Sequence, residues 1–318
     1  MGNKVSVIVL SYNQVNTISR TLDSILAQIV DFSFEIIIGD DASYDGTRNI
    51  CEQYAAKYPL CIKLMDKSTN KGVVKNYLDC LDKSNGKYIM GCAGDDWWHN
   101  RNKMQLQVSF LDSHSRFSLV FGGCILFNAQ SGQTYQSYPR NGVYSFYDLL
   151  SSNPISALTI CYRNTAKLKE ELKVLETEHF LMEDYPLYLI LAKSGDFYCM
   201  RDLLGTYTLS EGSISNSSSL SSKETFENDV LRVKLFFLKK YKIDDYKFQI
   251  LVLDMYHLSL STNGIRYNDK RYCLKHLLQI QRKRIVDYIK IVLCIVPFGF
   301  QILRSLNKKI IVKKSIVR

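Results

Sequence analysis

The sequence predicts an α/β fold with a mostly parallel central sheet and flanking helices, followed by a helical, basic C-terminal extension. Short β-branched segments alternate with amphipathic helical patterns in the first half, as in parallel sheets covered by helices. The composition, 46% hydrophobic and 23% charged, is ordinary for a globular protein. The 318 residues suffice for one large domain with an appendage, or for two modest domains.

Four β–α units are expected first. Their strands are continuous apolar runs, typical of strands buried on both faces, at 5–10, 34–39, 61–65 and 87–92. Apolar residues repeat at helical spacing between and after them, over 16–28, 46–58, 72–84 and 102–114. Further on we expect strands at 117–123, 157–163 and 196–200, a hairpin of 124–128 with 134–138, and a helix over 183–195.

The cysteines and the N-terminus indicate an intracellular protein. Nine cysteines, odd in number and never spaced as CxxC, argue against a disulfide framework and a structural zinc site, so we expect a reducing cytoplasm. The apolar run from Val5 lacks the basic region and long apolar core of a secretory signal, so none is expected. Gly2 matches the loose myristoylation pattern, but a buried first strand explains this region better.

Positive charge is concentrated at the C-terminal end. From Arg266 to Arg318 the chain has 14 Lys or Arg and 2 Asp or Glu. The apolar run 291–300 is too short to cross a bilayer. A basic amphipathic segment suits the headgroup region of an anionic membrane, whereas the alternative is a core helix with solvated lysines. Nucleic acid is not an expected partner. Binding it would need a basic stripe with exposed stacking aromatics, and the tail has apolar runs instead.

These observations divide the chain into two regions. We expect one domain over 1–222 and a helical C-terminal region over 223–318, with a membrane-surface segment at about 282–314. The protein is expected to be cytoplasmic and peripheral at the inner face of the cell membrane.

Two carboxylate pairs each follow a predicted strand, Asp40–Asp41 and Asp95–Asp96. Such strand ends are where α/β sheets bind ligands, although a single Asp there is often a turn or cap residue. Asp95 and Asp96 repel one another and lack a basic neighbour in sequence, so a Mg²⁺ or Mn²⁺ ion held on a diphosphate would supply the missing positive charge. The turn "SYNQVN" after the first strand lacks the glycines of a dinucleotide site.

Taken in order over residues 3–210, the motifs "VSVIVLSYNQ", "FEIIIGDDASYDGT", "NKGVVKNYLDCL", "GKYIMGCAGDDWWHN" and "MEDYPLYL" resemble the family 2 glycosyltransferases. The resemblance implies the GT-A fold, which is Rossmann-like, and inverting transfer from a nucleoside-diphosphate sugar. It does not cover the chain beyond 225.

The resemblance also implies roles for individual residues. Asp41 would accept from an N–H of the nucleotide base, Asp95 would lie near the ribose and Asp96 would bind the Mg²⁺ or Mn²⁺ ion directly. Asp184 would be the base that takes the proton of the acceptor hydroxyl, with Glu183 as its neighbour and fallback. The nucleotide-binding set is Leu10, Ser11, Tyr12, Asp41, Lys71 and Asp95.

Several alternatives remain open. Asp184, just ahead of Pro186, could instead be a helix N-cap whose pKa the helix dipole would lower. Tyr207 is followed by Thr208 where many family members have arginine, which puts a diphosphate contact in doubt. The loop 210–222 could close over the donor as a lid. His99, Trp97, Trp98 and Arg163 could each contact ligand, or only pack.

The expected function is that of a metal-dependent inverting glycosyltransferase of the hexosyltransferase type (EC 2.4 class). Its donor would be a UDP-sugar. Its acceptor would be a hydroxyl of a growing surface polysaccharide or oligosaccharide, such as a capsule or O-antigen, carried on a lipid. The alternative is a non-catalytic sugar-nucleotide or carbohydrate-binding protein with the same fold.

Overall fold

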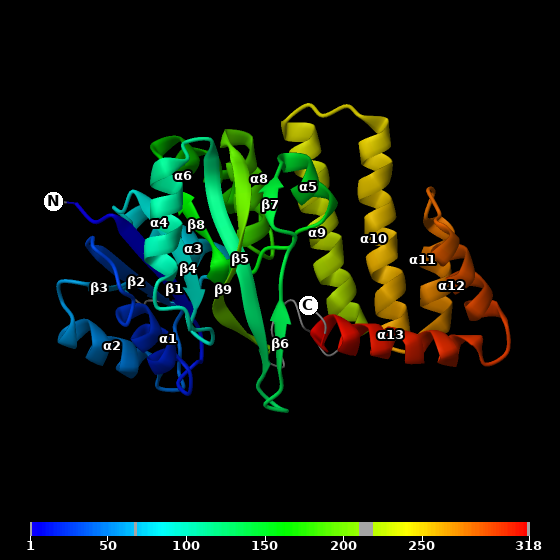
Figure 1. Ribbon diagram of the computed structural model, residues 1–318, viewed down its shortest axis with the longest axis horizontal. Coiled ribbons are helices and arrows are strands. Elements are labelled where there is room, and N and C mark those ends of the chain that lie inside the picture. The colour runs from blue at the N-terminus through cyan, green and yellow to red at the C-terminus, as the bar shows by residue number, and fades with distance from the viewer. Residues whose placement is uncertain (1, 67–68, 210–218, 317–318) are drawn as a thin grey trace. The chain divides into compact units, whose positions relative to one another are not determined.

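The computed structural model describes residues 2–66, 69–209 and 219–316 (Figure 1). The chain divides into two compact units, Met1–Leu149 with Asn153–Thr208, and Leu150–Ser152 with Leu209–Arg318. The domain boundary expected after residue 222 stays a prediction.

The first unit is built on one mixed sheet, which has nine strands in the described part of the chain. The strand order is β3-β2-β1-β4-β8-β5-β9-β7, with β6 paired to β5. Strands β1 to β4 pair in parallel, and β8, β5 and β6 continue antiparallel. The strands are β1 (Val5–Ser11), β2 (Phe34–Asp40), β3 (Ile62–Leu64), β4 (Tyr88–Ala93), β5 (Phe117–Asn128), β6 (Thr134–Ser137), β7 (Gly142–Tyr144), β8 (Cys161–Arg163) and β9 (Asp196–Leu209).

Helices cover both faces of this sheet. Val7 and Val9 of β1 belong to a core with α1, α2 and α4, whereas α3 packs against the opposite face, where Gly39 lies against Asn76 and Cys80. Successive strand residues point to opposite faces, so the burial of Val7, Ile8 and Val9 alike confirms a strand covered on both sides. The helices are α1 (Ile18–Leu26), α2 (Thr47–Lys57), α3 (Val73–Lys83), α4 (Lys103–Ser113), α5 (Phe146–Ser151), α6 (Ala166–Leu172), α7 (Val174–Glu178) and α8 (Asp184–Ser194).

The later strands differ most from the sequence predictions. The strand expected at 117–123 and the first arm of the hairpin form one strand, β5, which pairs with β6 as predicted. The strand expected at 157–163 begins with a 3₁₀ turn, Ala157–Thr159. The strand expected at 196–200 continues to Leu209, because sheet pairing carries it past the exposed Arg201 and Asp202 that interrupt its apolar pattern.

The second unit is helical in its described part. Its helices are α9 (Leu220–Lys240), α10 (Tyr246–Arg266), α11 (Lys270–Gln279), α12 (Ile285–Ile295) and α13 (Gly299–Ile316). The apolar run 291–300 is interrupted, because Pro297 follows the end of α12 and cannot continue the helix. Among the described residues, no helix is both long enough and apolar enough to cross a bilayer.

Candidate functional site

The carboxyl ends of β1, β2 and β4 lie at one edge of the sheet. The parallel register pairs Ser11 with Asp40 and Leu10 with Ala93. The chain therefore leaves these strands at the same edge, with Asp41 after β2 and Asp95 after β4. The half-buried Leu10 and the buried Ser11 end β1 between them.

Asp41 anchors the loop before α3. Its Oδ1 accepts the backbone N–H of Lys71 at 2.7 Å, and its Oδ2 accepts that of Gly72 at 2.9 Å. Gly72 has φ +79°, a conformation that favours glycine and lets its N–H face the carboxylate. Each carboxylate oxygen has a second lone pair, so the expected bond from a nucleotide base to Asp41 stays a prediction compatible with this geometry.

Two exposed tyrosines lie on the loops after β1 and β2. Tyr12 is 46% exposed and Tyr44 is 82% exposed, and their rings meet edge to face with centroids 6.3 Å apart. The loops are joined because the Asn13 N–H donates to Ser43 Oγ at 2.9 Å and the Tyr44 N–H donates to Asn13 Oδ1 at 3.1 Å. Exposed rings held in place this way suit stacking on a base.

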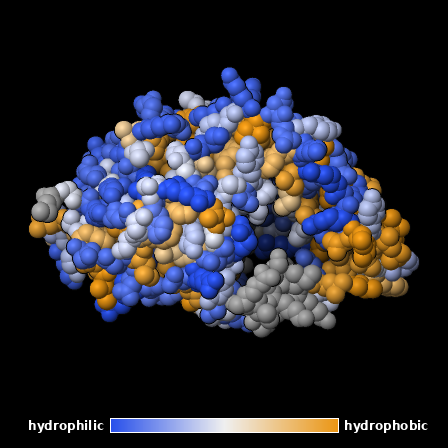
Figure 2. Space-filling view, turned by 45° about the horizontal axis from the view of Figure 1, so that its top comes forward, coloured by the Kyte–Doolittle hydropathy of each residue, from blue (hydrophilic) through white to orange (hydrophobic). Residues whose placement is uncertain are grey.

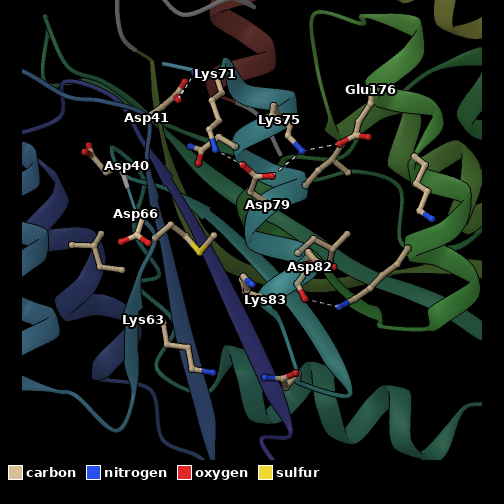
Figure 3. A pocket seen from close by; sticks show the side chains of 18 of the residues that line it. Asp40, Asp41, Lys63, Asp66, Lys71, Lys75, Asp79, Asp82, Lys83 and Glu176 are labelled. Carbon is tan, nitrogen blue, oxygen red and sulfur yellow. Dashed lines mark hydrogen bonds and ion pairs between the residues drawn. The ribbon is translucent and has the colours of Figure 1, made fainter. Parts of the chain in front are cut away.

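A cavity of about 1020 Å³ opens beside the Asp41 loop (Figure 3). Of the expected site residues, Asp41 and Lys71 are among those that line it. Lys71 Nζ bonds to Asp79 Oδ2 at 2.8 Å, and Lys75 Nζ bridges Asp79 and Glu176 at 2.9 and 2.8 Å. Ion pairs within the chain therefore already engage the lysine ammonium that we expected at the nucleotide.

Asp95 and Asp96 form a second group. Asp96 is 3% exposed, and its Oδ1 accepts the N–H of Thr208 at 2.8 Å. The Thr208 hydroxyl donates to the Asp95 carbonyl at 2.5 Å. Thr208, which follows Tyr207 where the resemblance led us to expect arginine, therefore positions Asp95 and Asp96.

Arg20 of α1 supplies a positive charge to this group. Its Nη2 donates to the Asp95 carbonyl at 3.1 Å, and its guanidinium carbon lies 3.6 Å from the centre of the Trp97 ring. Sequence reasoning missed Arg20, which is 75 residues from Asp95. Only its place on the first helix after β1 could have pointed to it.

The cation expected at the carboxylate pair stays a prediction. Burial raises the pKa of Asp95, and burial together with repulsion from Asp95 raises the pKa of Asp96 well above its ordinary value. Burial disfavours the ionised form of a carboxylate, and a nearby cation favours it. Carboxylate oxygens are ligands that suit Mg²⁺ or Mn²⁺. In the described part of the chain, no group of three or more His, Cys, Asp or Glu side chains could hold a metal ion.

Glu183 and Asp184 form a third group, half-buried at the start of α8. The N-cap position belongs to Glu183, which makes no side-chain capping bond, whereas Asp184 Oδ1 accepts the N–H of Tyr185 at 2.6 Å. Burial raises the pKa of Asp184, and burial with repulsion from Asp184 raises the pKa of Glu183 to about 8. The alternative, that Asp184 is the N-cap with a pKa lowered by the helix dipole, does not match this geometry, because Glu183 holds that position and desolvation outweighs the dipole.

Buried tyrosines surround this third group. Tyr188, one helical turn after Asp184, interacts electrostatically with both carboxylates, and burial raises its pKa well above the ordinary value. Its hydroxyl is buried without a hydrogen-bond partner among the described residues. Tyr162 and Tyr77, which also lie here, share a hydroxyl–hydroxyl bond. Sequence reasoning missed Tyr188, although its i, i+4 spacing from Asp184 was available.

The remaining candidates mostly pack. Trp98 is buried, and its Nε1 donates to the Leu158 carbonyl at 3.0 Å, while Trp97 stacks on Arg20. His99 Nδ1 lies 3.1 Å from Thr206 Oγ1. Of the two alternatives for Arg163 the structure favours packing, because antiparallel pairing places it beside Tyr88 at the other end of β4, where it donates to the carbonyls of Phe117 and Leu111. The expected lid 210–222 falls largely outside the described residues.

Glu183→Gln is expected to stabilise the protein at alkaline pH. The folded-state pKa of Glu183, about 8, lies above its ordinary 4.5, so the folded state binds this proton more tightly and stability falls as pH rises between these values. Glutamine removes the charge, so the free energy of unfolding should rise by about 1–3 kcal/mol above this range and change little below it. Urea unfolding of the wild type and the variant, below pH 4.5 and above pH 8, measures the change in free energy of unfolding. Glu52→Gln on the exposed surface is the control, and an equal effect of Glu183→Gln at both pH values would contradict the prediction.

Curated relatives cover different parts of the chain. "Uncharacterized protein Rv1520" of Mycobacterium tuberculosis is 40% identical over 117 residues, 37% of this chain, and the match spans only about a third of that protein, 34%. "Putative glycosyltransferase EpsE" of Bacillus subtilis is 35% identical over 61% of this chain and 68% of its own. "UDP-Glc:alpha-D-GlcNAc-diphosphoundecaprenol beta-1,3-glucosyltransferase WfgD" of Escherichia coli is 27% identical over 70% of this chain and 84% of its own.

Solved structures confirm the predicted fold. Staphylococcus aureus TarS 1–349 in complex with UDP-GlcNAc aligns over 98% of this chain and 88% of its own, with TM-score 0.58 and 19% identity. The mannosyltransferase PcManGT from Pyrobaculum calidifontis, in complex with GDP-Man and Mn²⁺, aligns over 99% of this chain and 87% of its own, with TM-score 0.55 and 16% identity. The family model "Glycosyl transferase family 2" matches residues 6–170, more than half of the chain. The chain therefore belongs to glycosyl transferase family 2.

Proposed function

We propose that the protein transfers a sugar from a nucleoside-diphosphate sugar to an acceptor hydroxyl with inversion at the anomeric carbon. The observation that carries this proposal is the carboxylate pair Glu183–Asp184, half-buried at the start of α8 near the Tyr188 hydroxyl, which is buried without a hydrogen-bond partner in the described part of the chain. Burial also raises the pKa of both carboxyl groups. A general base works best when its pKa lies near the working pH. A sugar hydroxyl is a poor nucleophile at neutral pH, so Asp184 would remove its proton as it attacks, with Glu183 as its neighbour and fallback.

Residues at the carboxyl edge of the parallel strands would hold the donor. The rings of Tyr12 and Tyr44 would stack on the base, and Asp41 would accept from its N–H while it keeps the Lys71–Gly72 loop in place. Asp95 would face the ribose. A bound Mg²⁺ or Mn²⁺ would neutralise charge that develops on the leaving diphosphate. Asp96 would hold that ion, because Thr208 fixes its carboxylate and the Asp95 backbone.

The names of relatives suggest the donor and acceptor. TarS was solved with UDP-GlcNAc, and WfgD is named for transfer of glucose from UDP to a diphosphoundecaprenol-linked sugar. We propose a UDP-hexose donor and a lipid-linked acceptor for this chain, which would place its reaction at a membrane surface where surface polysaccharide is assembled. PcManGT was solved with Mn²⁺, in line with the proposed cofactor.

The test is release of UDP by the full chain. Purified protein is incubated with UDP-glucose or UDP-GlcNAc, Mn²⁺ and a GlcNAc-diphospholipid, and UDP and the glycosylated lipid are quantified. The proposal expects UDP release that depends on acceptor and loss of signal on chelation. UDP-sugar binding in a thermal-shift experiment without any turnover, across donors and acceptors, would favour the non-catalytic sugar-nucleotide-binding alternative.

A further inference from the structure

Helix α12 has one buried side and one exposed side that is apolar. One side is buried in the second unit, where Cys294 packs in a core with Ile265, Cys273 and Leu277. The opposite side is exposed and carries large hydrophobic residues at helical spacing. These residues, which we name the α12 apolar face, are Ile285, Val286, Tyr288, Ile289, Val292, Ile295 and Val296, together with Phe298 just beyond the helix.

The exposure of this face is high for side chains of this kind. Ile285 is 82% exposed, Ile295 is 64% exposed and Phe298 is 78% exposed. Figure 2 shows hydrophobic residues gathered in one continuous area over α11 and α12. A contiguous exposed apolar patch marks an interaction site more often than scattered apolar residues do. A partner that covered this face would remove its apolar side chains from water.

The charge around the face indicates what the partner is. Residues 270–307 contain 8 Lys or Arg and one carboxylate, Asp287. Asp287 lies on the buried side of α12, 1% exposed, and pairs with Arg284 at 3.2 Å. The side chains of Arg282 and Arg284, which precede α12, are 48% and 63% exposed. Two half-exposed arginines therefore precede the face, each paired with a buried carboxylate, Asp254 or Asp287, and the helix itself presents no exposed carboxylate.

We propose that the α12 apolar face docks on an anionic lipid bilayer, with the helix lying in the headgroup region. Apolar side chains would enter the acyl boundary while the arginines contact lipid phosphates, which is how amphipathic basic helices bind membranes. Tyr288, 59% exposed, has the amphipathic ring that favours this interface. A second copy of the chain fits less well, because a symmetric contact would bring two positively charged borders together.

Vesicle sedimentation of the full chain tests this proposal without requiring turnover. Binding to vesicles of phosphatidylcholine with phosphatidylglycerol is expected to be about tenfold or more tighter than to phosphatidylcholine alone, and to weaken with salt. The double variant Ile289→Glu with Val292→Glu is expected to lose about tenfold or more of this binding. Leu60→Glu is the matched control, because Leu60 is 100% exposed in the first unit. Both changes add charge at exposed positions, so neither disturbs a core.

A second measurement places the helix itself. Val292→Trp adds a fluorophore at a position that is 55% exposed. After subtraction of the wild-type fluorescence, the emission maximum of the added tryptophan should shift to shorter wavelength when anionic vesicles are present. Absence of that shift, or equal vesicle binding by the double Glu variant and wild type, would overturn the proposal. A wild-type dimer that ignores vesicles and dissociates in the double variant would overturn it in favour of an interface between copies.

Discussion

Asp184→Asn should lower kcat for sugar transfer by about 10²–10⁴-fold, because the variant keeps the shape of the side chain but cannot accept the proton of the acceptor hydroxyl. The amide oxygen can still accept the N–H of Tyr185, so the start of α8 should remain folded. Initial rates of UDP release measure kcat, and a UDP titration measures donor affinity, which should not change.

Two comparisons make this prediction specific. Asp31→Asn removes an exposed carboxylate elsewhere in the first unit and should leave kcat unchanged. In the wild type, kcat/KM should fall as pH is lowered through the raised pKa of the Glu183–Asp184 pair, because the base must be deprotonated. An Asp184→Asn enzyme with wild-type kcat would exclude this residue as the base.

Asp96→Asn should lower kcat by about 10²–10³-fold, the usual cost of losing one group that stabilises developing negative charge. The variant can still accept the N–H of Thr208, so the loop after β4 should keep its conformation. In calorimetry, Mn²⁺ should tighten UDP binding to the wild type and have little effect on the variant.

The control for Asp96 is its neighbour. Asp95 lies half-buried beside Arg20, so Asp95→Asn should weaken donor binding while Mn²⁺ still increases the affinity for UDP. If wild-type UDP affinity is the same with Mn²⁺ and with a chelator, the proposed role of Asp96 is wrong.

Local patterns in the sequence predicted the first half of the fold well. Continuous apolar runs predicted β1, β2, β3 and β4, and apolar residues at helical spacing predicted α1 to α4, because these patterns follow from which faces each element buries. The short helices α6 and α7 were not predicted. Helices of five to seven residues are not stable alone and depend on packing against the rest of the unit.

The contacts that position the candidate residues could not be predicted from local patterns. Thr208 reaches Asp96 across 112 positions, and Arg20 reaches Asp95 across 75. Neither spacing follows a helical or strand period. The buried Lys103 is a further example, since its Nζ lies 4.0 Å from the Trp98 ring and donates to Gln107 Oε1 at 2.8 Å although the sequence shows only a charged residue at the start of a helix.

The sequence by itself determined the first four β–α units, the acidic residues at strand ends and the membership of a glycosyltransferase family, because periodicity and motif order depend on residues that are close together in the chain. Only the tertiary structure decided that burial raises the pKa of Asp184 where a helix end alone would lower it, and that α12 exposes an apolar side. Both depend on how much water distant segments remove from a residue. That quantity is a property of packing, which no local pattern contains.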